Sequence, residues 1–136
     1  MADLTKALHV SASGMDAQTT RLRVIAENLA NQDTLGSTPG ADAFRRKTIA
    51  FDTKMDAALG TATVRVKRIG KDTTDQPLRH DPTNPAANAS GYIKVPNINS
   101  FIEIMDMREA ERSYNANLAV MNATRGMLSR TIDMLK

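Results

Sequence analysis

The strongest constraint on this chain is a pair of long amphipathic stretches, one at each end, which enclose every proline and most of the glycines. In both stretches apolar side chains recur in alternating steps of three and four residues, the spacing that keeps side chains on one stripe of an α-helix. The first stripe consists of Leu8, Ala12, Met15, Leu22, Ile25, Ala26 and Leu29. The second consists of Ile104, Met107, Tyr114, Leu118, Met121, Leu128, Ile132 and Leu135. The pattern predicts a helix at each end of the chain.

The predicted lengths of these helices bear on what the stripes are for. At 1.5 Å per residue, a helix over 100–135 would run roughly 54 Å and one over 3–30 roughly 42 Å. A compact chain of this size has a radius of gyration of about 14 Å. Unbroken helices would therefore project beyond any globule, and their stripes would face water unless other chains covered them. We predict an assembly component whose two stripes are subunit-packing surfaces.

The ends of both helices carry capping signals. The first helix is predicted to begin near Asp3 as its N-cap and to end at the turn-prone residues 31–34. The second follows Asn99 or Ser100 as its cap, with Glu103 completing a capping box.

Gly14 interrupts the first helical pattern. A glycine inside a helix costs about 1 kcal/mol relative to alanine. It therefore indicates either a close approach by a neighbouring backbone or simple tolerance at an exposed position, and the sequence favours neither.

The segment between the helices has a different character. Residues 47–51, 63–69 and 91–95 show the composition or alternation of short strands. Residues 71–90 hold three prolines and several Asp and Asn residues, which predicts an exposed irregular loop.

These elements define a fold class and a division of the chain. We expect a mainly α protein in which long N- and C-terminal helices pack as an antiparallel coiled-coil-like pair, with a small β-rich element and loops between them. The corresponding parts are an N-terminal helix over 1–34, a β/loop middle element over 35–97 and a C-terminal helix over 98–136.

Several function classes are disfavoured by composition. The chain has no cysteine, which excludes disulfides and thiolate metal sites. Neither a Sec-type signal nor an apolar stretch long enough to span a bilayer is visible, so we expect no direct membrane insertion and export without a cleavable signal peptide. His80–Asp81 lacks a second histidine at ligand spacing, and phosphate cradles and nucleophile elbows are absent. We predict no catalytic site, metal, cofactor or small-molecule substrate.

The positive charge is mild and lies in the middle of the chain. Residues 36–96 carry ten basic against six acidic side chains, whereas both ends are nearly balanced. A nucleic-acid binder concentrates its basic charge on one face or helix and adds aromatic platforms. We interpret the basic run 45–47 and the cations of 65–68 as a solvated face or a contact to an acidic neighbouring subunit. A weak nucleic-acid binder is the alternative, although we expect no nucleic acid as a partner.

Two motifs resemble the signatures of bacterial flagellar rod and hook proteins. The end of the first helix carries the residues Asn28, Leu29, Ala30, Asn31 and Thr34. The second helix and its approach carry Pro96, Asn97, Glu103, Met105, Arg112, Tyr114 and Asn117. Their order and the short middle are similar to the proximal-rod members of the family, whereas the family's hook and distal-rod proteins have larger middle domains. Gln32–Asp33 and the loop after His80 depart from the usual pattern.

The resemblance implies a function and a location. It implies a structural subunit of the basal-body proximal rod, in the periplasm, which leaves the cytoplasm through the flagellar type III export apparatus. Its partners would be copies of itself and other rod proteins, packed through the terminal helices into an axial tube that transmits torque from motor to hook. The alternative is a soluble helical adaptor or export chaperone of the flagellar system.

Overall fold

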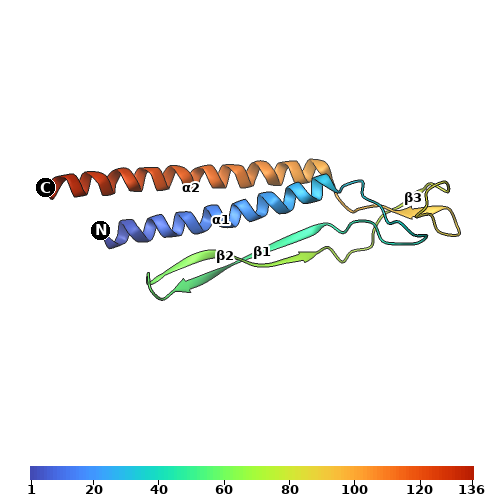
Figure 1. The fold of residues 1–136 in the computed structure, drawn as a ribbon, viewed down its shortest axis with the longest axis horizontal. Coiled ribbons are helices and arrows are strands. Elements are labelled where there is room, and N and C mark those ends of the chain that lie inside the picture. Colours follow the sequence, from blue (N-terminus) through green and yellow to red (C-terminus); the bar gives the residue numbers. More distant parts are fainter. The chain divides into compact units, whose positions relative to one another are not determined.

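The computed structural model describes all residues from 1 to 136 and consists of two long helices and two small β-sheets (Figure 1). Helix α1 spans Ala2–Ala30 and helix α2 spans Ser100–Met134, with 29 and 35 residues. Helices thus cover just under half of the chain. The helix predicted at each end is confirmed, as is the small β-rich element between them.

Helix α1 begins one residue earlier than predicted. The backbone N–H of Thr5 donates to the carbonyl of Met1 at 3.1 Å, so Asp3 lies inside the first turn. The predicted N-cap at Asp3 is therefore wrong. A carboxylate in the first turn is nevertheless favourable, because it faces the partial positive charge of the helix N-terminus. The helix ends at Ala30, where the turn-prone residues begin, as predicted.

Helix α2 is capped by Asn99, as predicted. Its side-chain Oδ1 accepts hydrogen bonds from the backbone N–H of Phe101 at 3.0 Å and of Ile102 at 3.5 Å. The predicted capping box is wrong, because the side chain of Glu103 binds Arg46 instead. A long-range ion pair has replaced a local backbone contact.

The larger sheet is a two-stranded hairpin. Strand β1 spans Lys47–Asp56 and pairs with β2 over Thr61–Lys71. At the turn, the Asp56 carboxylate accepts the backbone N–H groups of Ala58 and Leu59. Gly60 then adopts a φ of 63°, a left-handed conformation that glycine takes without steric cost.

The smaller sheet corrects the prediction for residues 71–90. Strand β3, Leu78–His80, pairs antiparallel with β4, Tyr92–Lys94, with Arg79 opposite Ile93. Lys71 also belongs to β2. The expectation of an entirely irregular loop was wrong because β3 lies between two prolines and keeps three consecutive N–H groups that can pair. Ile93 is fully buried and anchors this sheet.

The chain folds into two compact units, and each helix contributes to both. Unit 1 comprises residues 1–22, 49–68 and 107–136, and unit 2 comprises 23–48 and 69–106. Buried apolar side chains are few in both units. In unit 1 they are Ala17 and Ala110; in unit 2 they are Val24, Ile25, Ala43, Ala86 and Ile93.

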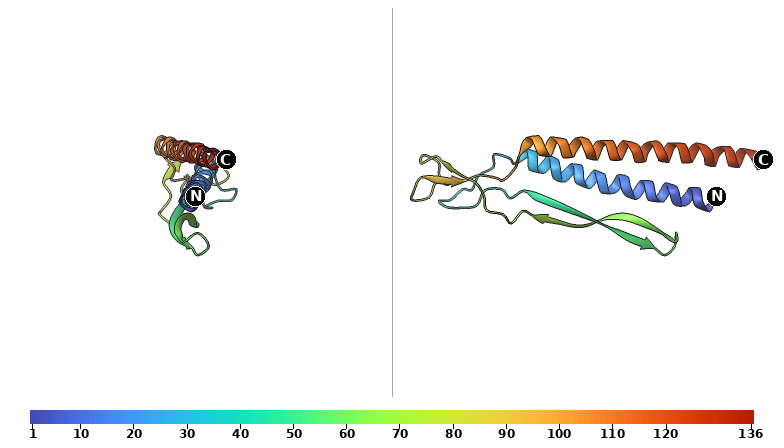
Figure 2. Two further views of the ribbon diagram at one scale, coloured as in Figure 1. Left: turned by 90° about the vertical axis from the view of Figure 1, so that its left-hand side faces the viewer. Right: turned by 180° about the vertical axis from the view of Figure 1, so that it is seen from behind.

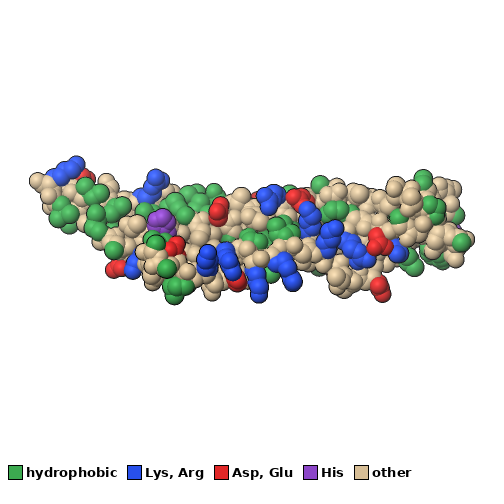
Figure 3. All heavy atoms as spheres, turned by 60° about the horizontal axis from the view of Figure 1, so that its bottom comes forward, with side chains coloured by type: hydrophobic (Ala, Val, Ile, Leu, Met, Phe, Trp, Pro, Cys, Tyr) green, Lys and Arg blue, Asp and Glu red, His purple; other side chains and the backbone are tan.

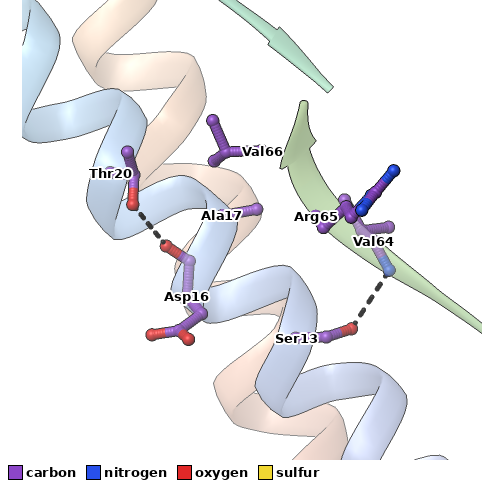
Figure 4. A pocket seen from close by; sticks show the side chains of 7 residues that line it. All are labelled: Ser13, Asp16, Ala17, Thr20, Val64, Arg65 and Val66. Atoms are coloured by element: carbon purple, nitrogen blue, oxygen red, sulfur yellow. Dashed lines mark hydrogen bonds between the residues drawn. The ribbon is translucent and has the colours of Figure 1, made fainter. Parts of the chain in front are cut away.

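Within unit 1, the β1–β2 hairpin lies alongside α1 (Figures 1 and 2). The backbone N–H of Val64 on β2 donates to the Ser13 hydroxyl at 3.3 Å, and Ala17 is 3% exposed. A shallow hollow of about 270 Å³ remains between helix and strand. Figure 4 shows the side chains that line it. Bulkier residues at these α1 positions would push β2 away.

Candidate assembly interface

The motif at the end of α1 contains a buried asparagine that binds a distant backbone. Asn28 is 1% exposed, and its Nδ2 donates to the carbonyl of Lys47 at 3.0 Å. In return, the backbone N–H of Lys47 donates to Asn28 Oδ1 at 2.8 Å. Asparagine offers a donor and an acceptor on one planar amide, so it pairs with this residue as a neighbouring strand would. The contact ties the last turns of α1 to the start of β1.

We expect Asn28→Leu to destabilise unit 2 by about 2–4 kcal/mol, because it leaves two backbone groups of Lys47 without partners. The loss should appear as a lower urea midpoint with an unchanged slope. Asn31→Ala is the matched control, since it alters the same motif at a partly exposed position. Equal midpoints for the two variants would contradict the role of the Asn28 amide.

The remaining polar residues of this motif shape the turn after α1. Asn31 Nδ2 donates to the carbonyl of Glu27 at 2.8 Å, and the Thr34 hydroxyl donates to Asn31 Oδ1 at 3.1 Å. The carbonyl of Thr34 then accepts the N–H of Phe44 at 3.0 Å. The spacing of these residues is thus explained by contacts within one subunit.

The basic run after this turn is bound inside unit 2. Arg45 donates to the carbonyls of Asp72 and Thr74 at 3.2 and 3.1 Å and to the carboxylate of Asp42. Arg46 pairs with Glu103, and Lys47 Nζ lies 2.6 Å from Glu27 Oε2. The interpretation of this run as a solvated face was wrong, whereas the alternative contact to an acidic neighbouring subunit stays a prediction. Each cation is held by residues distant in sequence.

Hydrogen bonds from cations hold several carboxyl groups in their charged form. The bond from Lys47 lowers the pKa of Glu27, and bonds from Lys94 and then Arg45 lower the pKa of Asp42. In unit 1, the hydrogen bond from Arg65 lowers the pKa of Asp52. In each case the charged carboxylate is the form that the folded chain favours.

The chain should lose stability in acid for this reason. A carboxyl group whose folded pKa lies below its unfolded value contributes stability above the unfolded pKa and loses that contribution as the pH falls through the folded pKa. The ordinary values are 3.8 for Asp and 4.5 for Glu, so the loss should begin below about pH 4.5. Urea midpoints at pH 7, 5 and 3 measure it. Asp42→Asn should flatten the decline, and an equal decline in that variant would contradict the assignment.

The second motif forms the joint that leads into α2. Glu103 is 1% exposed and is held by Arg46 Nε, while Arg46 Nη2 also lies 4.0 Å from Asp106. The other carboxylate oxygen of Glu103 is buried without a partner. Pro96 is buried, and Asn97 Nδ2 donates to the Thr74 hydroxyl at 3.1 Å. These motif residues also act within unit 2.

The Asn117 side chain lies close to Gly14, which accounts for the glycine at this position of α1. A Cβ atom on Gly14 would lie 2.9 Å from Nδ2 of Asn117, closer than such atoms approach in proteins. The close approach predicted at this glycine therefore exists, although the neighbour is a side chain and not a backbone. The Asn117 amide is held in place by its bond to the carbonyl of Ser113 at 3.1 Å. Gly126, in contrast, has open space around it.

The predicted packing residues fall into two groups in the structure. On α1, Ile25 is buried, and Leu8, Met15, Leu22 and Leu29 are half-buried. On α2, the half-buried members are Met107, Tyr114, Met121 and Leu128. The exposed members are Ala12, Ala26, Ile104, Leu118, Ile132 and Leu135. Each stripe thus has one edge that is buried or half-buried within its own chain and one edge that is exposed.

Other residues of the two motifs differ in exposure. Leu29 and Tyr114 are half-buried. Ala30, Thr34, Met105 and Arg112 are exposed.

A second exposed stripe on α2 was missed in the sequence. Val120 and Met127 are each 51% exposed and Met134 is 82% exposed, and they lie on one side of α2 with the exposed Ala116 and Ala123. Their spacing of three and four residues could have identified the row, but the neighbouring stripe contains more apolar residues and extends further along the helix. Green side chains remain at the surface near the C-terminal end of α2 in Figure 3.

The inward side of α2 is small and polar in comparison. Ala110 and Thr124 are buried and Asn117 is half-buried at heptad spacing, which places alanine and polar groups where a conventional helix pair has leucine. The larger apolar side chains of this helix therefore lie on its flanks and outer side. That inversion is expected of a chain that packs with others.

The structure also bears on chemistry at the surface. No group of three or more His, Asp or Glu side chains has a geometry that could hold a metal ion. His80 lies against Tyr92 edge to face, with ring centroids 5.1 Å apart. Neither helix is long and apolar enough to cross a membrane.

Comparisons with known proteins agree with this reading. Residues 8–36 match the family model described as flagella basal body rod protein, and residues 89–134 match that of the flagellar basal body rod FlgEFG protein C-terminal region. The chain is 48% identical over 136 residues to the flagellar basal-body rod protein FlgC of Agrobacterium fabrum, covering 100% of this chain and 98% of that protein.

More distant relatives carry the same name. The chain is 37% identical over 144 residues to FlgC of Bacillus subtilis, covering 95% of this chain and 96% of the relative. It is 36% identical over 127 residues to FlgC of Salmonella typhimurium, covering 92% of each. Such identity over nearly whole chains is sufficient to assign the family. The chain belongs to the FlgC family of flagellar basal-body rod proteins, and it is a structural rod subunit and not an enzyme.

Proposed function

We propose that this subunit forms part of the proximal rod and assembles there through the exposed faces of α1 and α2. The observation that carries the proposal is the exposure of large apolar side chains along α2, among them Phe101 at 71%, Ile102 at 52% and Met127 at 51%. Such side chains would be covered by helices of neighbouring subunits. The partners are copies of this chain and other rod proteins.

Within unit 1, α1 and α2 pair in an antiparallel arrangement under this proposal. Gly14 lies against Asn117, and Arg21 lies 3.7 Å from Glu109. A shallow groove nearer the N-terminus is lined by Leu8 and Met121. Residue numbers thus rise on one helix as they fall on the other, which supports the predicted coiled-coil-like pair. The small seam residues permit the close approach that such a pair needs.

The same proposal assigns roles to the parts of the chain. The segments 1–34 and 98–136 supply the packing helices, and 35–97 supplies a β-rich connector whose polar contacts brace both helix ends. The subunit would reach the periplasm through the flagellar type III export apparatus. Many repeated helix contacts in a closed tube resist twisting, which is how the rod would transmit torque from motor to hook.

Hydrogen exchange tests the proposal directly. Amides of α1 and α2 should be weakly protected in the dilute purified chain and strongly protected in isolated basal bodies, because assembly covers the exposed faces. Size analysis at rising concentration, with and without other rod proteins, is the companion measurement. Strong protection in the dilute monomer, or a complex of fixed size that stops growing, would instead favour a soluble adaptor or export chaperone.

A further inference from the structure

A polar pocket in unit 2 lies beside the ion pair of Arg46 and Glu103. The backbone N–H of Asp72 donates to the carbonyl of Arg46 at 2.8 Å, and Arg46 binds Glu103, so three distant segments meet there. The pocket has a volume of about 310 Å³ and is lined by Arg46, Asp72, Asn97, Asn99, Ile102 and Glu103. We propose that it binds a primary ammonium group, the side chain of a lysine on a neighbouring rod subunit. The inference rests on the proposed function only for the source of that lysine.

Three oxygen atoms of the lining residues lack hydrogen-bond partners. Glu103 is 1% exposed, and its Oε2 is closed off from solvent without a partner. Two hydrogen bonds from Thr74 reach Oδ1 of Asp72 and lower the pKa of this carboxyl, while its Oδ2 accepts none. Asn97 donates through Nδ2 to the Thr74 hydroxyl, and its Oδ1 accepts none. An ammonium group has three donors and no acceptor, so its donors match these oxygens in number.

The charge of the pocket also favours a cation. Two of its lining side chains, Asp72 and Glu103, are carboxylates, and one, Arg46, is a cation, which leaves one negative charge in excess. Arg46 is further drawn towards Asp106, whose Oδ2 lies 4.0 Å from Nη2. The nearby Arg45 directs its Nη2 to Asp42 at 3.1 Å. A bound ammonium would therefore neutralise the pocket.

The arrangement of the free oxygens favours an ammonium over other cations. A guanidinium binds best to both oxygens of one carboxylate. Arg46 takes Oε1 of Glu103 and Thr74 takes Oδ1 of Asp72, so each carboxylate has one oxygen left. The pocket also lacks the three carboxylate or imidazole groups that a metal ion would need. Single oxygens on separate side chains suit the three rotatable donors of a lysine.

The rim of the pocket indicates that a protein supplies the ammonium. Ile102 is 52% exposed, and its neighbours on α2, Phe101 and Met105, are 71% and 54% exposed. These apolar side chains would cover the aliphatic stem of a lysine and the surface that carries it, whereas a small free amine would leave them in water. Arg46 and Ile102 are both partly exposed, so a rotamer change of either can admit the ammonium to Glu103 Oε2.

Binding of a lysine analogue to the purified full chain tests the site. The probe is N-acetyl-lysine amide, and the matched probe is the same compound with its ε-amine acetylated, which keeps the stem and removes the charge. Backbone amide NMR shifts are followed at pH 7. We expect saturable shifts confined to residues 72–74 and 97–103 with the charged probe and none with the neutral one. Equal shifts with both probes, or shifts only elsewhere, would overturn the inference.

Variants of the pocket locate the binding. Asp72→Asn should weaken binding of the charged probe roughly tenfold, because it removes a charge and keeps an oxygen. Asp75→Asn is the matched control, since it removes the same charge from an exposed residue outside the lining, and it should bind like the unmodified chain. Urea midpoints check folding, and the exposed Asn97→Ala, which should also weaken binding, replaces Asp72→Asn if that variant unfolds. Equal affinities for the pocket and control variants would exclude this pocket as the site.

Carbodiimide cross-linking in isolated basal bodies identifies the source of the ammonium. The reagent joins a carboxylate to an amine in direct contact with it. We expect a cross-link between Asp72 and a lysine of a neighbouring subunit, and its absence with Asp72→Asn. If the purified chain binds the probe but basal bodies lack this cross-link, the assignment to a neighbour's lysine is wrong. Rods that assemble normally in that case leave the proposed function intact.

Discussion

Arg46→Ala is expected to produce the largest loss of stability in this chain. The substitution leaves the carboxylate of Glu103, which is 1% exposed, in a buried site without its cation. Breaking a buried ion pair from one side typically costs about 3–5 kcal/mol. The other carboxylate oxygen, Glu103 Oε2, already lacks a hydrogen-bond partner. The free energy of unfolding in urea measures the effect.

Replacing both members of the pair distinguishes the effect of the buried charge on stability from the effect of lost packing. Arg46→Met combined with Glu103→Met should recover most of the stability, because no buried charge remains. Arg45→Ala is the matched control, because Arg45 is the preceding residue in the segment that leads into β1. Its partners are an exposed carboxylate and two backbone carbonyls, so its loss leaves no buried charge. If the double variant is as unstable as Arg46→Ala, the pair is not the source of the loss.

Leu118→Asp is expected to abolish swimming while the isolated chain stays folded. Leu118 is 37% exposed, so a carboxylate there remains solvated in the monomer. In an assembled rod the same carboxylate would be buried at every repeated contact, and an unpaired buried charge is costly. Swim-plate diameter and the content of this protein in purified basal bodies measure assembly. Circular dichroism of the purified variant measures folding.

Two further variants sharpen this result. Asn115→Asp adds the same charge at an exposed polar position of α2 and should leave swimming intact. Leu22→Asp is also expected to block assembly, but Leu22 is half-buried in its own chain, so its folding would suffer too. Normal swimming with Leu118→Asp would mean that this edge of the stripe lies outside every subunit contact.

The helices could be predicted because their apolar residues recur over many turns, and because each repeat depends only on residues three or four positions apart. The cap at Asn99 followed from local chemistry in the same way. Strand β3 could not be foreseen, because it exists through pairing with β4, which lies more than ten residues further along the chain. Its three residues carry no strong pattern of their own.

The polar contacts of the motif residues could not be predicted from the spacing of residues in the sequence. Glu103 has the right position for a capping box, yet its partner Arg46 lies 57 residues away. The pairing of Asn28 with Lys47 is equally non-local. The sequence also could not show which side of α2 faces the rest of its own chain, because the usual rule places apolar residues inward. Here Asn117 faces inward and Leu118 is exposed.

The polar seam between α1 and α2 has a mechanical consequence. Gly14 and Asn117 meet at a position of unit 1 where leucines would meet in a conventional helix pair, so this contact contributes little buried apolar surface to a lone molecule. We expect the isolated chain to hold its helices together less firmly at this contact than a leucine seam would. The stiffness of the rod would then come mainly from the contacts between subunits in the assembled structure.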